Sequence, residues 1–152
     1  MQREIKFRMF DCSIPEMILN QRRVFECLSR MSDEILNHEL IFMQSTGLKD
    51  FDGAEIFEHD VLQLPGHDPK RNYGFGDFMD GKKIVIEWCP IKSGFCIFKL
   101  DEYKKHLKSE REGVADMSKR RYGLKSFLGD FNIGFHAPVI GNIWENPELL
   151  GE

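Results

Sequence analysis

The sequence predicts a mainly β fold of the α+β class with one or two short helices. Three observations lead to this prediction: short runs of alternating or continuous apolar residues recur, turn signals rich in Gly, Pro and Asp separate them, and segments with helical periodicity are few. The chain has 152 residues, of which 41% are hydrophobic and 13 are Phe. A chain of this length and composition is expected to form one domain with its own core.

The first half of the chain is expected to contain three strands. Residues 3–11 alternate apolar and charged side chains, which is typical of a half-buried strand, and 17–19 can return beside it as a paired strand. The apolar run at 40–43 indicates a buried strand. The intervening residues 20–39 fit either a helix or a strand, and the sequence leaves that choice open.

The clearest local signals lie between 45 and 64. Asp52 and Gly53 form a dipeptide typical of a type I′ turn, because Gly accepts a positive φ and Asp tolerates one. A second tight turn is expected at 58–60, and 61–64 then reads as a strand.

The second half predicts a β-hairpin followed by a helix. Apolar runs at 83–88 and 94–100 are separated by a turn that contains Pro90. Asp101 is expected to cap the helix that follows. The end of the chain, 139–150, reads as a short strand that runs into an Asn-Pro turn.

The net charge of −4, from 21 basic and 25 acidic residues, excludes a globally basic nucleic-acid coat and an acidic disordered tail. No apolar run approaches the roughly 18 residues that a membrane span needs, and charged residues stand where a secretory signal would begin. We therefore expect a cytoplasmic protein without membrane contact.

Four cysteines raise the question of a zinc site. The closest pair, Cys89 and Cys96, is too widely spaced for the usual C-x2-4-C arrangement, and the histidines lie singly. We expect Cys12, Cys27, Cys89 and Cys96 to be reduced and mostly buried, and we expect no cofactor.

Three segments resemble the YopX-like proteins of phages and prophages. They are REIKFRMFD at 3–11, MQSTGLKDFDGAEIFEHDVL at 43–62 and VIGNIWENPELL at 139–150. The resemblance implies a small mixed-sheet pseudobarrel, encoded by a phage or prophage and made in a bacterial cytoplasm, and it implies no reaction. It makes 1–152 a single YopX-like domain, with a lineage-specific basic helical or loop elaboration at about 101–125.

Two departures from the family pattern bear on the fold. The family commonly has Ala-Trp-Asp where this chain has Met9, Phe10 and Asp11, an exchange of apolar groups that a core can absorb. Its usual Glu-Gly-Asp turn is Glu-His-Asp at 58–60. His tolerates a positive φ better than most side chains do, so we expect this turn to persist with some strain.

An acidic group in the second motif is a candidate metal site. A divalent-metal nuclease or hydrolase needs two or three carboxylates that converge on one ion, and Asp50, Asp52 and Asp60 are the candidates. Their positions in tight turns favour the alternative, in which they are solvated turn carboxylates. No nucleophile motif or catalytic constellation is apparent.

The charge is strongly polarised along the chain. Residues 104–125 contain eight Lys or Arg against three Asp or Glu, a net charge of +5, which leaves −9 for the remainder. A solvated helix face and an exposed loop account for this segment, yet it can also bind phosphates or an acidic protein. The long loop at 66–81 adds aromatic side chains. The candidate contact residues are Lys119, Arg120, Arg121, Tyr122, Lys125, Tyr73 and Phe75.

The sequence therefore favours a non-enzymatic binding module whose partner is a protein rather than a nucleic acid. An RNA- or DNA-binding protein that uses 104–125 is the first alternative, and a divalent-metal-dependent nuclease or hydrolase is the second. On the favoured interpretation the motifs are scaffold, and the residues expected to form turns and core are Thr46, Gly47, Gly53, Ile56, Val61, Val139 and Ile143.

Overall fold

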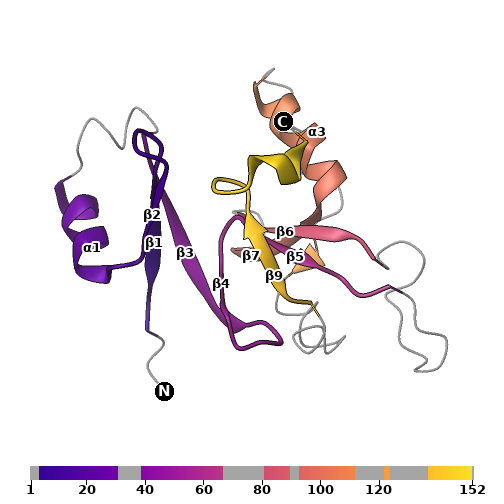
Figure 1. Ribbon diagram of the computed structural model, residues 1–152, viewed down its shortest axis with the longest axis horizontal. Coiled ribbons are helices and arrows are strands. Elements are labelled where there is room, and N and C mark those ends of the chain that lie inside the picture. The colour runs from indigo at the N-terminus through magenta and orange to yellow at the C-terminus, as the bar shows by residue number, and fades with distance from the viewer. Residues whose placement is uncertain are drawn as a thin grey trace.

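The described residues form two curled antiparallel sheets and the helices α1 and α3 (Figure 1). The order of strands is β2-β1-β3-β4 in the first sheet and β8-β7-β6-β5-β9 in the second. The predicted mainly β, α+β class is confirmed, and every strand pairing among the described residues is antiparallel. This computed structural model describes residues 4–30, 39–66, 81–89, 93–111, 122–123 and 137–151.

The first sheet is built on one long strand. The strand expected at 40–43 extends to Lys49: its first half pairs with β1 and its second half with β4. Gly47, at φ 75°, lies within the register shift of the β3–β4 pairing, between Ser45 and Lys49. A positive φ favours glycine, so Gly47 accommodates this irregularity of the ladder. The strands are β1 (Phe7–Asp11), β2 (Glu16–Ile18), β3 (Leu40–Lys49) and β4 (Glu55–Phe57).

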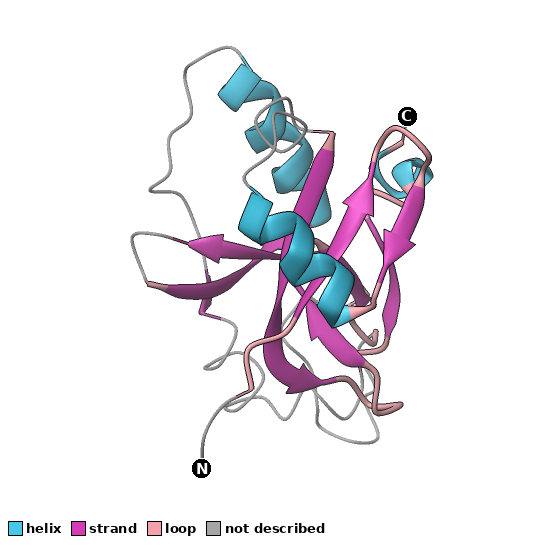
Figure 2. Ribbon diagram, turned by 90° about the vertical axis from the view of Figure 1, so that its left-hand side faces the viewer, coloured by secondary structure: helices cyan, strands magenta, loops and turns pink. Residues whose placement is uncertain are grey.

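Helix α1 (Gln21–Arg30) resolves part of the segment that the sequence left open. The Asn20 side chain accepts the backbone N–H of Arg23 at 3.1 Å and so caps the first turn. Val24, fully buried, packs the helix against the first sheet. Figure 2, viewed from the side of α1, shows this helix in front of the strands.

The second sheet contains the predicted hairpin. Strands β6 and β7 pair in continuous register, with Ile86 opposite Ile97, and β5 pairs with β6 on one side and with β9 on the other. The strands are β5 (Asp60–Gln63), β6 (Lys83–Cys89), β7 (Gly94–Lys99), β8 (Tyr122–Gly123) and β9 (Val139–Asn142).

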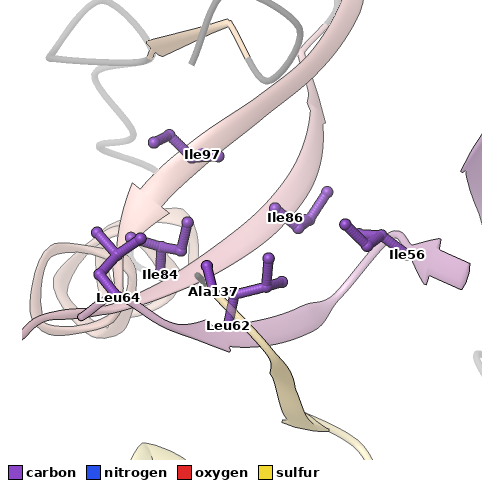
Figure 3. Packing of buried hydrophobic residues seen from close by; sticks show 7 residues of the cluster. All are labelled: Ile56, Leu62, Leu64, Ile84, Ile86, Ile97 and Ala137. Atoms are coloured by element: carbon purple, nitrogen blue, oxygen red, sulfur yellow. The ribbon is translucent and has the colours of Figure 1, made fainter. Parts of the chain in front are cut away.

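Both faces of the second sheet are covered with buried side chains. Successive residues of a strand point to opposite faces, so Leu62 and Ile84 lie in one cluster while Val61 and Val85 lie in another. Figure 3 shows the first cluster, which consists of Ile56, Leu62, Leu64, Ile84, Ile86, Ile97 and Ala137. Continuous apolar runs in β6 and β7 are the sequence signature of strands that are buried on both sides.

Helix α3 (Leu100–Arg111) covers the second cluster through Tyr103, which is 1% exposed. With Asp101 as its cap, this helix was expected to begin at Glu102, and it begins two residues earlier, at Leu100. Asp101 therefore lies in its first turn rather than at the cap, where its negative charge still favours the positive end of the helix dipole. No helix of the described segments is both long and apolar enough to cross a membrane.

The hairpin between β3 and β4 differs from the predicted type I′ turn. Gly53 has a φ of 84°, but Asp52 does not have the positive φ that such a turn also requires. Asp50 donates its N–H to the carbonyl of Ala54 at 2.8 Å, and Gly53 donates to the carbonyl of Asp50 at 3.1 Å. The connection is therefore a three-residue loop that ends on a left-handed glycine.

The end of the chain follows the prediction. The strand predicted to begin at 139 is β9. Asn146 then precedes the short 3-10 helix η2 (Pro147–Leu150). Gly151 closes η2 with a φ of 75° and donates its N–H to the carbonyl of Glu148.

Candidate functional site

The three motif segments, far apart in the sequence, meet where the chain passes from the first sheet to the second. The first contributes Arg8 on β1, the second Asp60 at the start of β5, and the third Asn142 at the end of β9, which pairs directly with Asp60. The residues that meet here are called the motif junction, and they are Arg8, Phe10, Asp50, His59, Asp60, Val139, Asn142 and Trp144.

A buried ion pair lies at the centre of the motif junction. Arg8 Nη2 donates to Asp60 Oδ1 at 2.6 Å, and the two side chains are 10% and 1% exposed. The other oxygen of Asp60 accepts the N–H of Phe57 at 2.8 Å, and the Arg8 guanidinium lies over the Phe57 ring. Burial raises the pKa of Asp60, whereas the guanidinium of Arg8 and the N–H of Phe57 oppose that rise. Both oxygens of this carboxylate are therefore engaged within the fold.

His59 occupies the turn between β4 and β5 with a φ of 66°. The expected tight turn is confirmed, with His accepting the positive φ. Its N–H donates to the carbonyl of Ile86, its carbonyl accepts the N–H of Ile143, and its Nδ1 accepts Trp144 Nε1–H at 2.9 Å. Burial lowers the pKa of His59 to about 4, and the positive charge of Arg8 adds to this effect. His59 is therefore neutral at pH 7, with its proton on Nε2.

The third motif forms a side-chain-stabilised turn. Asn142 Oδ1 accepts the N–H groups of Trp144 and Glu145 at 3.0 and 2.9 Å, and its Nδ2 donates to the Glu145 carboxylate. A side chain that replaces two backbone partners in this way specifies a turn directly. Trp144 thereby lies 6.4 Å, ring to ring, from Phe10 of the first sheet, and the two rings are stacked.

Gly141 lets the same turn close tightly. It has a φ of 152°, and a Cβ placed there would lie 2.3 Å from Asn146 Oδ1, the atom that accepts the N–H of Asn142. Only glycine fits beside that oxygen without displacing it.

Asp50 ties the β3–β4 hairpin to β9. Its Oδ1 accepts the N–H of Ala54 at 2.8 Å, and its Oδ2 accepts the N–H of Val139 at 2.9 Å. The expectation of solvated turn carboxylates is wrong for Asp50 and Asp60, which are both buried because they satisfy backbone donors. Asp52, in contrast, is exposed in its turn. Within the described segments, no group of three or more His, Cys, Asp or Glu side chains is placed to hold a metal ion.

The core assignments from the sequence are confirmed, but Thr46 and Gly47, which were expected in turns, lie within strand β3. Ile56 and Val61 are fully buried, and Ile143 is buried as well. Thr46 Oγ1 donates to the carbonyl of Ile56 at 2.8 Å and accepts the N–H of Leu48 at 3.1 Å. Val139 is only partly buried and packs against the first cluster of the second sheet.

The predicted contact residues are largely outside the described segments. Lys119, Arg120, Arg121, Lys125, Tyr73 and Phe75 lie there. The backbone of Tyr122 belongs to β8 and pairs with Ile97. Of the basic segment, Lys104 and Lys105 are described, and both are exposed on α3.

The thiols are less buried than predicted. Cys12, Cys27 and Cys96 are thiols that form no disulfide, as expected; of these three Cys96 is buried, Cys27 is half-buried and Cys12 is exposed. Cys12 lies outside the core because it occupies the turn between β1 and β2.

Arg8 is the residue that the sequence interpretation missed. The alternation along 3–11 placed it on a solvent face, but Arg8, Met9 and Phe10 are all buried, so both faces of β1 are covered here. Phe10, two residues further on, was the available signal, because an aromatic side chain on the supposedly polar face indicates that this face is also packed. The apolar pair of Met9 and Phe10 is buried, as the departure from the family pattern led us to expect.

These features define a small two-sheet β domain in which the motif residues bond to one another and to the backbone. The chain belongs to the family described as YopX protein, whose sequence profile matches residues 6–151. In fold it is similar to the crystal structure of protein EF1440 from Enterococcus faecalis, at a TM-score of 0.52 and 21% sequence identity, over 98% of this chain and 99% of that one. No curated protein matches the sequence.

Proposed function

We propose that this chain is a non-enzymatic protein-binding module, encoded by a phage or prophage and active in the bacterial cytoplasm. The observation that carries the proposal is the bonding of the motif junction. Asp50 and Asp60 each accept hydrogen bonds at both carboxylate oxygens, and the Nδ1 of His59 accepts a hydrogen bond from Trp144 Nε1–H. A general acid, a general base or a metal ligand needs a free position from which to reach its substrate or ion.

On this proposal the partner contacts surfaces outside the junction. The favoured contact regions remain the basic segment 104–125 and the aromatic loop at 66–81. Two lysines of that basic segment, Lys104 and Lys105, are exposed on α3. Electrostatic complementarity with an acidic protein would guide association and specificity.

The proposal is tested by capturing partners from the bacterial host with two tagged variants. K119E/R120E/R121E reverses the favoured patch, and K49E/K82E/K83E makes the same change in net charge at exposed positions elsewhere. We expect the first variant to lose a partner that the wild type and the second variant retain, while all three melt at similar temperatures. Equal capture by all three proteins, or by none, would count against this surface.

Nucleic acid is the alternative that the +5 segment supports. Binding through phosphates releases counterions, so the affinity for single-stranded RNA or duplex DNA must fall steeply between about 50 and 200 mM salt. Absence of binding at the lower salt concentration would eliminate this alternative.

The metal-dependent alternative is tested through the exposed carboxylate. If Mn²⁺ or Mg²⁺ bound at the second motif, it would raise the melting temperature, and Asp52→Asn would abolish that rise without disturbing the fold. The proposal expects no rise in either protein.

A further inference from the structure

A pocket of about 220 Å³ lies between α1 and the first sheet, away from the motif junction. Its floor is apolar and consists of Met9, Ile18 and Leu40, and its charged lining consists of Asp11, Arg23 and Glu39. Cys27 of α1 and Ser13 complete the lining. We call this cavity the α1 pocket.

The size and floor of the α1 pocket suit one long side chain. Pockets for drug-sized ligands typically enclose about 300–1,000 Å³, so this one is too small for most cofactors. Met9 and Ile18 are buried members of the cluster around Val24, which makes the floor part of the packed interior. A ligand therefore needs a slim apolar stem.

The charged lining is negative in sum, with two carboxylates and one guanidinium. Asp11 Oδ1 accepts the N–H of Ser13 at 2.9 Å and its hydroxyl at 2.5 Å, bonds that orient this carboxylate and lower its pKa. The backbone of Glu39 is fixed as well, because its carbonyl accepts the N–H of Cys12 at 2.7 Å. An anionic ligand would face two carboxylates, whereas a purely apolar one would desolvate them without compensation.

We propose that the α1 pocket binds an arginine side chain of a partner protein, an inference that rests on the proposed function. The methylene groups would lie on Met9, Ile18 and Leu40, and the guanidinium would bind the carboxylates of Asp11 and Glu39. Long basic side chains combine an apolar stem with a charged head in this way. The planar fork of guanidinium pairs with carboxylates better than an ammonium does, so arginine is preferred over lysine.

The pocket provides its own reporter. The probe is Nα-acetyl-arginine amide, its uncharged counterpart is Nα-acetyl-citrulline amide, and the readout is the rate at which Cys27 is alkylated by iodoacetamide. Cys12, which is exposed and outside the lining, serves as the internal reference. We expect the arginine probe to slow alkylation of Cys27 about threefold at twice its Kd, because protection follows occupancy. Neither probe should protect Cys12; because Asp11 and Glu39 help to raise the pKa of its thiol, an arginine bound to them should leave its alkylation as fast or faster.

Charge variants give effects of opposite sign. Asp11→Asn or Glu39→Gln should weaken the arginine probe about fivefold, because each removes a carboxylate partner of the guanidinium. Arg23→Gln should tighten it about twofold, because it removes a like charge from the rim. Asp52→Asn, an exposed change in the β3–β4 hairpin and outside the pocket lining, is the matched control and should leave the affinity unchanged.

The outcomes separate this inference from the proposed function. Equal protection by the citrulline probe, no protection at all, or weaker binding in Arg23→Gln would overturn the pocket assignment. A heptapeptide with one central arginine among alanines provides the final arm. If the amide binds but this peptide does not, the pocket does not accept a protein side chain and the inference fails, whatever partner the basic segment captures. Binding of both probes supports the inference, even if the basic segment captures no partner.

Discussion

The two sheets are stabilised in different ways. The second sheet is buried on both faces, with seven buried residues in one cluster and six in the other. Among the described residues, the cluster between the first sheet and α1 has three buried members, Met9, Ile18 and Val24, while Ile56 of the first sheet belongs to the seven-residue cluster of the second. The larger apolar core therefore lies on the second sheet, and the first sheet shares it through Ile56.

The motif junction compensates for this difference. Arg8 binds Asp60 across the boundary between the sheets, Phe10 stacks on Trp144, and Asp50 holds the N–H of Val139. Directed polar contacts thereby join the two sheets beside the apolar contact made by Ile56. The polar residues of the motifs therefore contribute to stability at the boundary between the two sheets.

The largest effect is expected from breaking the ion pair. Arg8→Met leaves the carboxylate of Asp60 buried and without its cation, and loss of one partner of a buried pair costs about 3–5 kcal/mol. Urea denaturation measures this cost. The control is Lys6→Met, two residues before Arg8, which removes a more exposed ion pair, that of Lys6 with Glu55. Its expected cost is below about 1 kcal/mol. Equal losses in the two variants would refute the role assigned to Arg8.

The next largest effect tests the turn after β9. Gly141→Ala places a methyl group against Asn146 Oδ1 and strains the backbone, so we expect a loss of about 2–3 kcal/mol in the free energy of unfolding. Gly66→Ala, where the added Cβ meets nothing within 4 Å, should be tolerated. If thermal melting ranked Gly66→Ala below Gly141→Ala, the close packing of the third motif would not matter for stability.

The pH dependence of stability tests His59. Its pKa is about 4 in the folded protein and near 6.5 when unfolded, so the unfolded chain binds more protons between these values. Stability from this residue is complete above pH 6.5 and is lost as the pH falls toward 4, at no more than about 1.4 kcal/mol per pH unit. His59→Asn tolerates the positive φ but lacks the titration.

The variant isolates His59 from its neighbours. Burial raises the pKa values of Glu58 and Asp60, so these groups act in the opposite direction in acid. Urea denaturation at pH 7.5, 6.5, 5.5 and 4.5 should show the stability advantage of the wild type over His59→Asn shrinking as the pH falls. An advantage that is constant with pH would mean that His59 is not held neutral.

The smallest effect on the free energy of unfolding is expected from an Ile→Val substitution, which is made once in each sheet to compare their cores. Ile86→Val in the second sheet should cost about 1–1.5 kcal/mol, and Ile18→Val on the edge strand of the first about 0.5 kcal/mol, because the edge site can relax more readily. Chemical denaturation of both variants gives the comparison. The reverse order would show that the first sheet is the better packed one.

Local signals predicted much of the second sheet. The runs at 83–88 and 94–100 are apolar and adjacent, so β6 and β7 needed little tertiary information. The turn at His59 was predicted from the family pattern and the tolerance of His for a positive φ. The helical nature of 21–30 was left open because the stripe of Val24, Leu28 and Met31 is short, and a short apolar pattern does not separate a helix from a strand.

The motif junction was beyond such reasoning. Asp50 and Val139 are 89 residues apart in the sequence, and Arg8 and Asp60 are 52 apart. The hydrogen bond from the N–H of Ala54 to Asp50 Oδ1 follows from the local turn. The sequence near Asp50 gives no sign that its Oδ2 accepts the N–H of Val139. The α1 pocket likewise depends on side chains from three strands or their turns and from one helix.

The central claim is that the motif junction makes the two sheets one cooperative unit. Native-state hydrogen exchange tests it at three amides: Ser45, which donates to Lys6 within the first sheet, Phe57, which donates to Asp60, and Leu64, which donates to Lys82 beside the second sheet. We expect all three amides to exchange through the same opening of the fold, so that each gives an exchange free energy equal to the free energy of global unfolding. If Ser45 exchanged through an opening about 2 kcal/mol or more below that of Leu64, the first sheet would open alone and the claim would be contradicted.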